Sequence, residues 1–288
     1  MSFVVRAPAT SANLGPGFDC FGAALELWNE LEVTSGTGAV VLEGEGAGEL
    51  PRGAEHLALR AFSLVAPVEG HDFRFVNRIP LERGLGSSAA TIACGLVAGL
   101  AVAGRDATAD EVLALGLPLE GHADNLAPAV FGGVCLSWRN GTGYMHTRRL
   151  ATDLPLAPIV VVPDTRVNTE ASRGRLPASV SHADAAAASA QAALLGAAVA
   201  AGDADLLAAA FHDKLHEPYR VEDAPLLAEL RDDPVPGTAG VTLSGSGPSV
   251  VVWAAKADAA AVAAALDARL PDAEVLPLSI AEQGAARA

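Results

Sequence analysis

A short run of glycine and serine, Gly84-Leu85-Gly86-Ser87-Ser88, constrains the fold of this chain more than any other feature. Residues 73–79 alternate between apolar and polar side chains, which predicts a strand, and residues 89–102 have the composition of a helix. Glycines let a backbone approach a ligand closely, and the free N–H groups at the start of a helix attract negative charge. Ser87 or Ser88 is expected to cap this helix. The run predicts a phosphate-binding loop, and a plain helix-capping turn is the alternative.

Two well-known nucleotide loops can be compared with this run. A Walker loop needs a lysine before its Ser or Thr, and the only lysines here are Lys214 and Lys256, so that loop is excluded. The spacing Gly84-x-Gly86-x-x-Ala89 does match a degenerate dinucleotide fingerprint. However, residues 80–83 separate it from the predicted strand, whereas the dinucleotide turn is tight. Because the glycine spacing matches, a dinucleotide-binding oxidoreductase remains an alternative despite this mismatch.

Strand and helix patterns are mixed along the chain. Further strands are predicted at residues 3–5, 25–33, 39–42, 134–138, 156–162, 240–243 and 249–254, and a polar turn rich in Gly and Pro at residues 8–18. Helices are predicted at residues 55–66, 109–117, 204–215 and 257–268, with a long alanine-rich helix before residue 204. This mixture predicts an α+β fold. The proline-containing segment at residues 154–158 predicts a boundary between a domain of residues 1–152 and a domain of residues 153–288.

Composition excludes several classes of partner. The net charge of −15 repels a phosphate backbone, so no nucleic-acid partner is expected. A local nest of N–H groups can still hold ATP. The three cysteines, Cys20, Cys94 and Cys135, have neither disulfide nor zinc spacing and predict buried free thiols. The start of the chain lacks a signal-peptide pattern and no apolar stretch predicts a membrane span, so a cytoplasmic location is expected.

Three segments together resemble the GHMP kinases, a family named for galactokinase, homoserine kinase, mevalonate kinase and phosphomevalonate kinase. The first is residues 7–19, the second is residues 80–90, and the third is residues 243–249. The resemblance implies a two-domain fold, with an N-terminal domain like that of ribosomal protein S5 and a C-terminal ferredoxin-like domain. It also implies that ATP is bound by Pro80, Leu81, Glu82, Arg83, Gly84, Leu85, Gly86, Ser87, Ser88, Ala89, Ala90, Gly245, Ser246 and Gly247.

Other segments are similar to the substrate-binding parts of the homoserine kinases in this family, so L-homoserine is the implied substrate. The similar segments imply that Thr169, Arg173 and Arg220 bind substrate, and arginine suits a carboxylate because its planar fork binds two oxygens. Asp19 is expected to pair with the ammonium group, and Asn13 to bind polar substrate atoms. The segment His122-Ala123-Asp124-Asn125 implies that His122 and Asn125 lie beside the acceptor hydroxyl. Each of these types is also common on surfaces or in turns.

The resemblance further implies Mg²⁺, catalytic parts for Asp19, Asn125 and Ser88, and a homodimer. Ser88 and Glu120 are the expected metal ligands, although Pro118 replaces an acidic residue of the family pattern. Without a lysine in any motif, no strong general base is expected, and the hydroxyl proton passes to phosphate or water. His212 and His216, four residues apart, have metal-like spacing, but we expect them to be helix-face or supporting residues. Another GHMP kinase and an inactive binding protein of this fold remain alternatives, and His56-Leu57 departs from the family's adenine contact.

Overall fold

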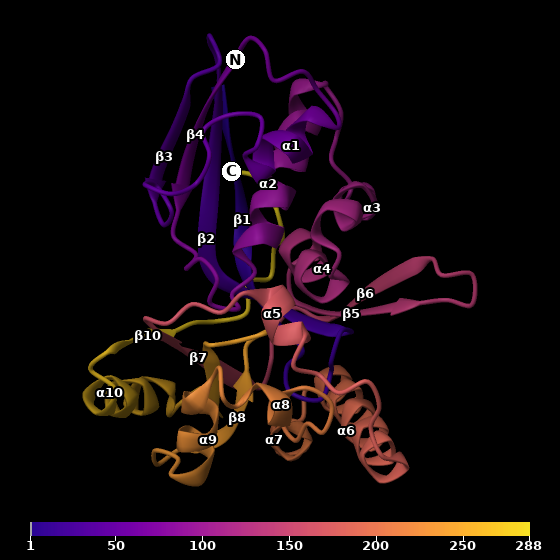
Figure 1. Ribbon diagram of the computed structural model, residues 1–288, viewed down its shortest axis with the longest axis vertical. Helices are drawn as coiled ribbons and strands as arrows, with labels where there is room; N and C mark the ends of the chain where they lie inside the picture. The colour runs from indigo at the N-terminus through magenta and orange to yellow at the C-terminus, as the bar shows by residue number, and fades with distance from the viewer. Residues whose placement is uncertain (1) are drawn as a thin grey trace.

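The computed structural model describes residues 2–288, which form two β-sheets with helices packed on them (Figure 1). Within these residues the larger sheet has the strand order β11-β1-β2-β4-β3, and β2 also pairs with β5, which pairs with β6. Only β3 and β4 are parallel; every other pair is antiparallel. The strands of this sheet are β1 (Ser2–Ala12), β2 (Phe21–Ser35), β3 (Val40–Gly44), β4 (His71–Asn77), β5 (Val134–Arg139), β6 (Met145–Ala151) and β11 (Ala286–Arg287).

One face of the larger sheet carries helices. They are α1 (Leu57–Ser63), α2 (Ser87–Val102), α3 (Ala109–Glu120) and α4 (Ala123–Phe131). Leu31 and Val33 of β2 are buried, whereas Glu30 and Glu32, which alternate with them along the strand, are half-exposed, as expected for a sheet with one covered face. The α2 helix is buried along most of its length and lies against both β1 and β2. Its N-terminus is thereby held at the end of the sheet that faces the second half of the molecule (Figure 1).

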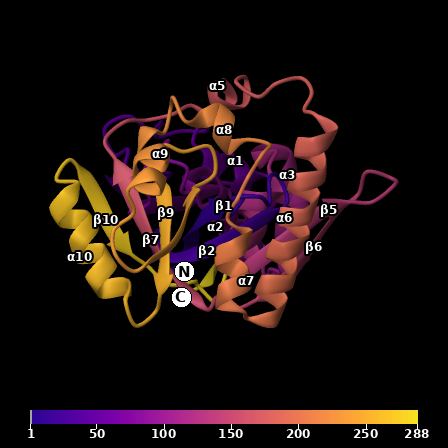
Figure 2. The same cartoon turned by 90° about the horizontal axis from the view of Figure 1, so that it is seen from below.

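The smaller sheet consists of β7 (Leu156–Pro163), β8 (Thr238–Leu243), β9 (Val250–Ala255) and β10 (Ala273–Pro277). Its order, β10-β7-β9-β8, is 4-1-3-2 when the strands are numbered within this half, as in ferredoxin-like folds. Figure 2 shows it from below. The helices of this half are α5 (Thr169–Arg173), α6 (His182–Ala201), α7 (Ala204–Ala210), α8 (Glu217–Arg220), α9 (Pro225–Asp232) and α10 (Ala259–Arg269).

Strand β7 joins the two halves, because its side chains point alternately into two hydrophobic cores. Val160 and Val162 belong to the large core that extends into the N-terminal half, whereas Ile159 and Val161 face a smaller core formed with α9 and α10. Side chains alternate between the faces of a strand, so this one strand contributes to both cores. The smaller sheet is therefore packed on both faces, and it forms a firm base for the loops at its edge.

The connection between the sheets is short, but the chain crosses back at its end. Strand β6 ends at Ala151 and β7 begins at Leu156. After β10, Ser279 accepts a hydrogen bond from Glu26, Ile280 bridges to Leu25, and β11 pairs with β1. The final residues thus lie on the sheet of the first half. The fold is α+β, as expected.

Three predictions about local structure were wrong. The turn predicted at residues 8–18 begins only after Ala12, because residues 8–12 pair with β2. The N-cap of α2 is Gly86, with φ +65°, so Ser87 and Ser88 are the first helical residues and cap nothing. The helix predicted at residues 204–215 ends at Ala210. Helix α4 was not predicted at all.

The cysteines are free, as predicted. Cys94 and Cys135 are buried and Cys20 is half-buried. Burial raises the pKa of the Cys20 thiol to about 11 and that of the Cys135 thiol to about 12, so both stay protonated and unreactive at neutral pH. Of the helices in the described chain, α6 alone has the length and apolar composition of a membrane span. It packs against α7 and β6, and such a match by itself is weak support for a span.

Candidate active site

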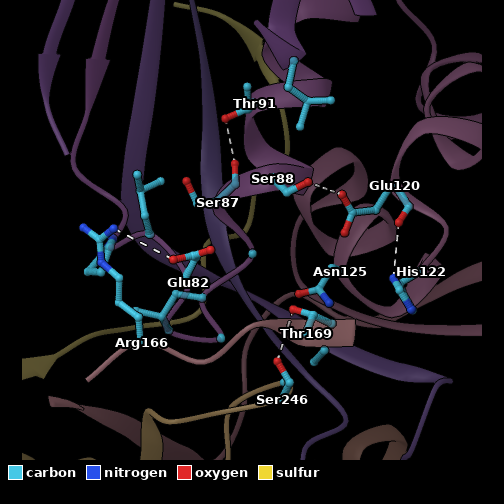
Figure 3. A pocket seen from close by; sticks show the side chains of 18 of the residues that line it. Glu82, Ser87, Ser88, Thr91, Glu120, His122, Asn125, Arg166, Thr169 and Ser246 are labelled. Atoms are coloured by element: carbon cyan, nitrogen blue, oxygen red, sulfur yellow. Dashed lines mark hydrogen bonds and ion pairs between the residues drawn. The ribbon is translucent and has the colours of Figure 1, made fainter. Parts of the chain in front are cut away.

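A cleft of about 530 Å³ lies between the two halves. All three segments that resemble the GHMP kinases line it, together with the α3–α4 junction, α5 and α8. Figure 3 shows the side chains that point into it, with Ser87 and Ser88 on one side and Thr169 and Ser246 on the other. Segments more than two hundred residues apart in sequence thus share one wall.

The glycine-serine loop is in backbone contact with the other two segments. Thr10 donates its N–H to the carbonyl oxygen of Leu85 at 3.0 Å. A Cβ on Gly86 would lie 1.8 Å from Oγ1 of Thr10, and one on Gly84 would lie 2.2 Å from the carbonyl oxygen of Ser244. Both glycines also have positive φ. Glycine is required here by steric contact and by backbone conformation, and its absence of a side chain lets the three loops meet.

The first turn of α2 supplies oxygen ligands as well as N–H groups. Ser88 donates from Oγ to Oε2 of Glu120 at 2.6 Å (Figure 3). Burial raises the pKa of the Glu120 carboxyl group, while the Ser88 hydrogen bond acts against that rise. The hydroxyl at the start of α2 and the carboxylate at the end of α3 lie side by side, and together they fit a small hard cation that keeps water and phosphate as its other ligands. Among the residues that the structure describes, no group of three or more His, Cys, Asp or Glu could enclose a metal.

The other end of the cleft carries two arginines and an aspartate. Arg173 donates from Nη2 to Oδ1 of Asp19 at 2.6 Å. Arg220 is 3% exposed, and its Nη1 donates to the carbonyl oxygen of Gly245 and to Nδ1 of His216. The Nε of Arg220 has no partner within the described chain. The ring of Phe18 lies under both guanidinium groups, at 5.7 Å and 5.6 Å. Burial, and then the nearby Arg173, lowers the pKa of Arg220, although a guanidinium stays charged at neutral pH.

Asp124 is a cleft residue to which sequence analysis gave no role. It is 4% exposed and lies at the start of α4. Burial, and then the charge of Asp19, raises the pKa of its carboxyl group to about 7. A titratable group so perturbed in a cleft is a candidate functional residue. The signal was present, because Asp124 lies inside the quoted segment between His122 and Asn125.

The α3–α4 junction also places His122 and Asn125 in the cleft. Oδ1 of Asn125 accepts a hydrogen bond from Oγ1 of Thr10 at 2.9 Å, which leaves the amide N–H groups for other partners. His122 donates from Nδ1 to the carbonyl oxygen of Glu120. Both side chains therefore have a fixed orientation, and both are seen at the right of Figure 3.

Comparison with known proteins agrees with this arrangement. Residues 51–133 match the model of the GHMP kinase N-terminal domain. Homoserine kinase from Moorella thermoacetica is 42% identical over 87% of this chain and 86% of its own length. The homoserine kinase of Streptomyces avermitilis is 41% identical over 96% of both chains. This chain belongs to the homoserine kinase family.

A solved homoserine kinase, from Cytophaga hutchinsonii, has the same fold with a TM-score of 0.87 and 25% identity, and the match covers 100% of this chain and 97% of that one. The fold expected from the resemblance to the GHMP kinases is confirmed. Kinases of this family use ATP, so the cleft has a nucleotide to hold.

Most of the residues that the resemblance to the GHMP kinases and their homoserine kinase segments implied do line the cleft. They are Asn13, Asp19, Pro80, Leu81, Glu82, Gly84, Leu85, Gly86, Ser87, Ser88, Glu120, His122, Asn125, Thr169, Arg173, Arg220, Gly245 and Ser246. Asn13 lines it with both amide atoms already in contact with the protein, since Nδ2 donates to the carbonyl oxygen of Gly245 and Oδ1 accepts from the N–H of Asp19. Thr169 and Ser246 have their hydroxyl oxygens 3.3 Å apart.

Four of the expected nucleotide residues lie behind the lining. Ala89 and Ala90 are fully buried in α2. Arg83 donates to the carbonyl oxygens of Pro163 and Asp164 in the other half of the molecule. Gly247 closes a turn by donating to Ser244. These four residues support the loops. The residues that line the cleft but were not predicted from the sequence include Phe18, Glu49, Asp124 and Arg166.

His56 has a structural role at the nucleotide end. Its Nδ1 accepts from the N–H of Ala58 and so caps α1. Burial lowers the pKa of His56 to about 4, so the ring is neutral at physiological pH. His56, which departs from the family's adenine contact, therefore contributes a neutral, helix-capping ring to the cleft wall.

Proposed function

We propose that this chain transfers the γ-phosphoryl group of ATP to the side-chain hydroxyl of L-homoserine, giving O-phospho-L-homoserine for threonine synthesis. One observation carries this proposal: the buried Arg220, with an unpaired Nε, beside the Asp19–Arg173 pair. Arg220 lines the cleft, and no carboxylate among the described residues forms an ion pair with it. Buried charges are normally paired, so this cation indicates where a ligand carboxylate binds. The two charge signs needed by an amino-acid zwitterion are side by side.

Each polar group of homoserine has a counterpart in the cleft. Arg220 and Arg173 bind the carboxylate, since a guanidinium pairs with two oxygens at once. Asp19 and Asp124 face the ammonium group. Asn125 and His122, which line the cleft at the α3–α4 junction, contact the hydroxyl end. Mevalonate has a carboxylate but no ammonium group, and a neutral sugar has neither charge, so neither substrate matches both the arginines and the aspartates of this cleft.

The transfer itself relies on position and charge. The hydroxyl oxygen of homoserine attacks the γ-phosphorus, the bond from that phosphorus to the bridging oxygen of ADP breaks, and the hydroxyl proton passes to phosphate or water. The N–H groups at the start of α2 and the Ser88 hydroxyl bind the phosphates. Among the described residues, no lysine lines the cleft. Asp19 and Asn125 orient the acceptor, which is how most phosphoryl transfer is accelerated.

Ser88 and Glu120 hold Mg²⁺ in this proposal. The ion would neutralise part of the charge on the transferred phosphoryl group. A Glu120→Gln variant keeps the shape and loses the charge, so we expect at least about a tenfold rise in the Mg²⁺ concentration that gives half-maximal rate. The measurement is a magnesium titration of the ADP-forming rate. Glu111→Gln, on the same helix but paired with Arg105 outside the cleft, is the control. Equal titration curves for both variants would remove Glu120 from the metal site.

The remaining parts of the proposal concern assembly and location. We propose a cytoplasmic homodimer in which a second copy covers the β5–β6 hairpin that projects from the body in Figure 1. Trp138 and Tyr144 are exposed on it, and residues 125–152 contain three arginines but no Asp or Glu in a chain of net charge −15. An acidic copy complements this basic, aromatic surface. Sedimentation equilibrium should give twice the chain mass, and the monomer mass for Trp138→Ser/Tyr144→Ser; a monomeric unmodified chain would contradict the dimer.

A further inference from the structure

His216 is the fully buried histidine that immediately precedes α8. Its ring stacks on Phe18, with ring centroids 5.0 Å apart. Its backbone N–H donates to Oδ2 of Asp213 at 2.7 Å, and so does the N–H of Glu217. The ring is therefore fixed from several directions. His216 is not among the residues that line the cleft, so any effect on the substrate passes through a neighbour.

The two ring nitrogens have different partners, and these partners define the tautomer. Nε2 lies 2.8 Å from the carbonyl oxygen of Gly15, which can only accept, so Nε2 carries the hydrogen. Nδ1 lies 3.1 Å from Nη1 of Arg220, which can only donate, so Nδ1 carries a lone pair. The hydrogen is therefore on Nε2, and the Nδ1 lone pair accepts from the guanidinium.

These contacts link the first glycine-rich loop to the carboxylate-binding arginine. Gly15 lies between Asn13 and Phe18, and Asn13 holds the N–H of Asp19. Nη1 of Arg220 is shared between His216 and the carbonyl oxygen of Gly245. With Nη1 engaged in this way, the guanidinium has a fixed rotation, and its remaining N–H groups have no partner among the described residues.

We infer that His216 is a positioning residue for the substrate carboxylate, acting through Arg220. The inference rests on the proposed function, because it assumes a carboxylate ligand at Arg220. Without the ring nitrogen, Arg220 gains freedom to rotate, and the carboxylate must then fix the side chain at the moment of binding. The expected effect is a weaker hold on homoserine with little change in ATP binding.

The test is a cycle of two substrates and two enzymes. L-homoserine and L-homoserine amide differ at the carboxylate, and the amide lacks the charge that Arg220 binds. For the unmodified protein we expect kcat/KM to be about a hundredfold lower with the amide. In His216→Leu, kcat/KM for homoserine should fall about tenfold through KM, while that for the amide changes little. The ratio between the substrates then shrinks about tenfold.

Two isosteric variants separate the ring nitrogens. His216→Asn places an amide oxygen near the position of Nδ1, and His216→Gln reaches the position of Nε2. Because Arg220 contacts Nδ1, Asn should restore more of the homoserine KM than Gln. His212→Asn, at an exposed residue four positions earlier in the loop before α8, is the control, and its KM for homoserine should be unchanged. Thermal unfolding and KM for ATP report whether each variant is folded, and the Asn and Gln variants decide the question if the Leu variant does not fold.

Opposite outcomes overturn the inference. If both substrates lose the same factor in every His216 variant, the ring serves only stability. If Gln restores the KM and Asn does not, the Gly15 contact is the important one. If the unmodified protein phosphorylates neither substrate, the proposed function fails first, and that result is distinct from a failure of the inference.

Discussion

The carboxyl group of Asp124 lies in the cleft almost without contact with water. Its pKa of about 7 means that folding makes this group harder to ionise than in the unfolded chain, where it titrates near 3.8. The folded protein therefore binds the extra proton between these two values. Stability from this group is present at low pH and is lost as the pH rises through 7. A site that binds an ammonium group has a physical reason to keep such a carboxylate.

Replacing Asp124 by Asn removes this dependence. The free energy of unfolding of Asp124→Asn, relative to that of the unmodified protein, should be more favourable at pH 8 than at pH 5. We expect this relative stability to be on the order of 2–3 kcal/mol larger at pH 8. Urea unfolding at the two pH values measures it, with the exposed Asp106→Asn as control. If the two variants shift alike, the burial of Asp124 has no such energetic effect.

Kinetics can separate the possible roles of Asp124. As an ammonium ligand it must be ionised, so kcat/KM for homoserine should rise with pH through about 7 in the unmodified protein. Asp124→Asn should raise KM at least tenfold. A large fall in kcat with unchanged KM would instead indicate a general base.

Residue types in the site could be predicted from the sequence, but their partners could not. Asp19 and Arg173 were each assigned a different end of the substrate, and the structure pairs them across 154 positions of sequence. Asn13 and Asp19 have positive φ, which residues other than glycine rarely adopt. Asn and Asp tolerate this conformation better than other residues with a side chain, but the contact between the loops, from Nδ2 of Asn13 to the carbonyl oxygen of Gly245, could not be predicted from the sequence.

For helices and strands, the sequence predicted the middle of most elements well and the residues at which they begin or end poorly. The strand before the glycine-serine loop and the helix after it were expected from periodicity, and both exist as β4 and α2. The start of α2 was missed because Gly86, packed against Thr10, fixes where the helix begins. Helix α4 was missed because it is short and contains Pro128.

Helix α5 has five residues and carries both Thr169 and Arg173, so its N-cap affects the site. Asn168 accepts from the N–H groups of Glu170 and Ala171. Asn168→Ala should cost about 1 kcal/mol locally and raise KM for homoserine about three- to tenfold. Ser181→Ala removes a comparable cap from α6, which carries no cleft residue, and should leave KM unchanged. Steady-state kinetics of both variants checks this, and equal KM values would contradict it.

For the whole molecule, the two halves are joined by contacts that the sequence does not reveal. The fold class followed from the mixture of strands and helices and from three ordered motifs. The pairing of β11 with β1 joins residues about 280 positions apart, and no local pattern predicts it. Ser244 likewise donates to the carbonyl oxygen of Gly84 at 2.7 Å across the cleft wall.

Arg83 crosses between the halves with hydrogen bonds from Nε to Pro163 and from Nη2 to Asp164. Arg83→Ala should lower the free energy of unfolding by about 1–3 kcal/mol. It should also raise KM for ATP, because the loop before α2 loses its anchor. Arg52→Ala, whose hydrogen bond stays within its own loop at Ala47, is the matched control. Unfolding curves and ATP titrations that match the control would show that Arg83 does not hold the halves together.

Coupled ADP release with ATP and Mg²⁺, measured with L-homoserine, L-threonine, L-serine, mevalonate or galactose, shows most directly which substrate the cleft accepts. We predict ADP release that depends on L-homoserine, with one equivalent of O-phospho-L-homoserine formed per ADP. An inactive binding protein would bind without turnover. No homoserine-dependent ADP release, or faster release with mevalonate or galactose, would contradict the assignment of Arg173, Arg220, Asp19 and Asp124 to an amino-acid substrate.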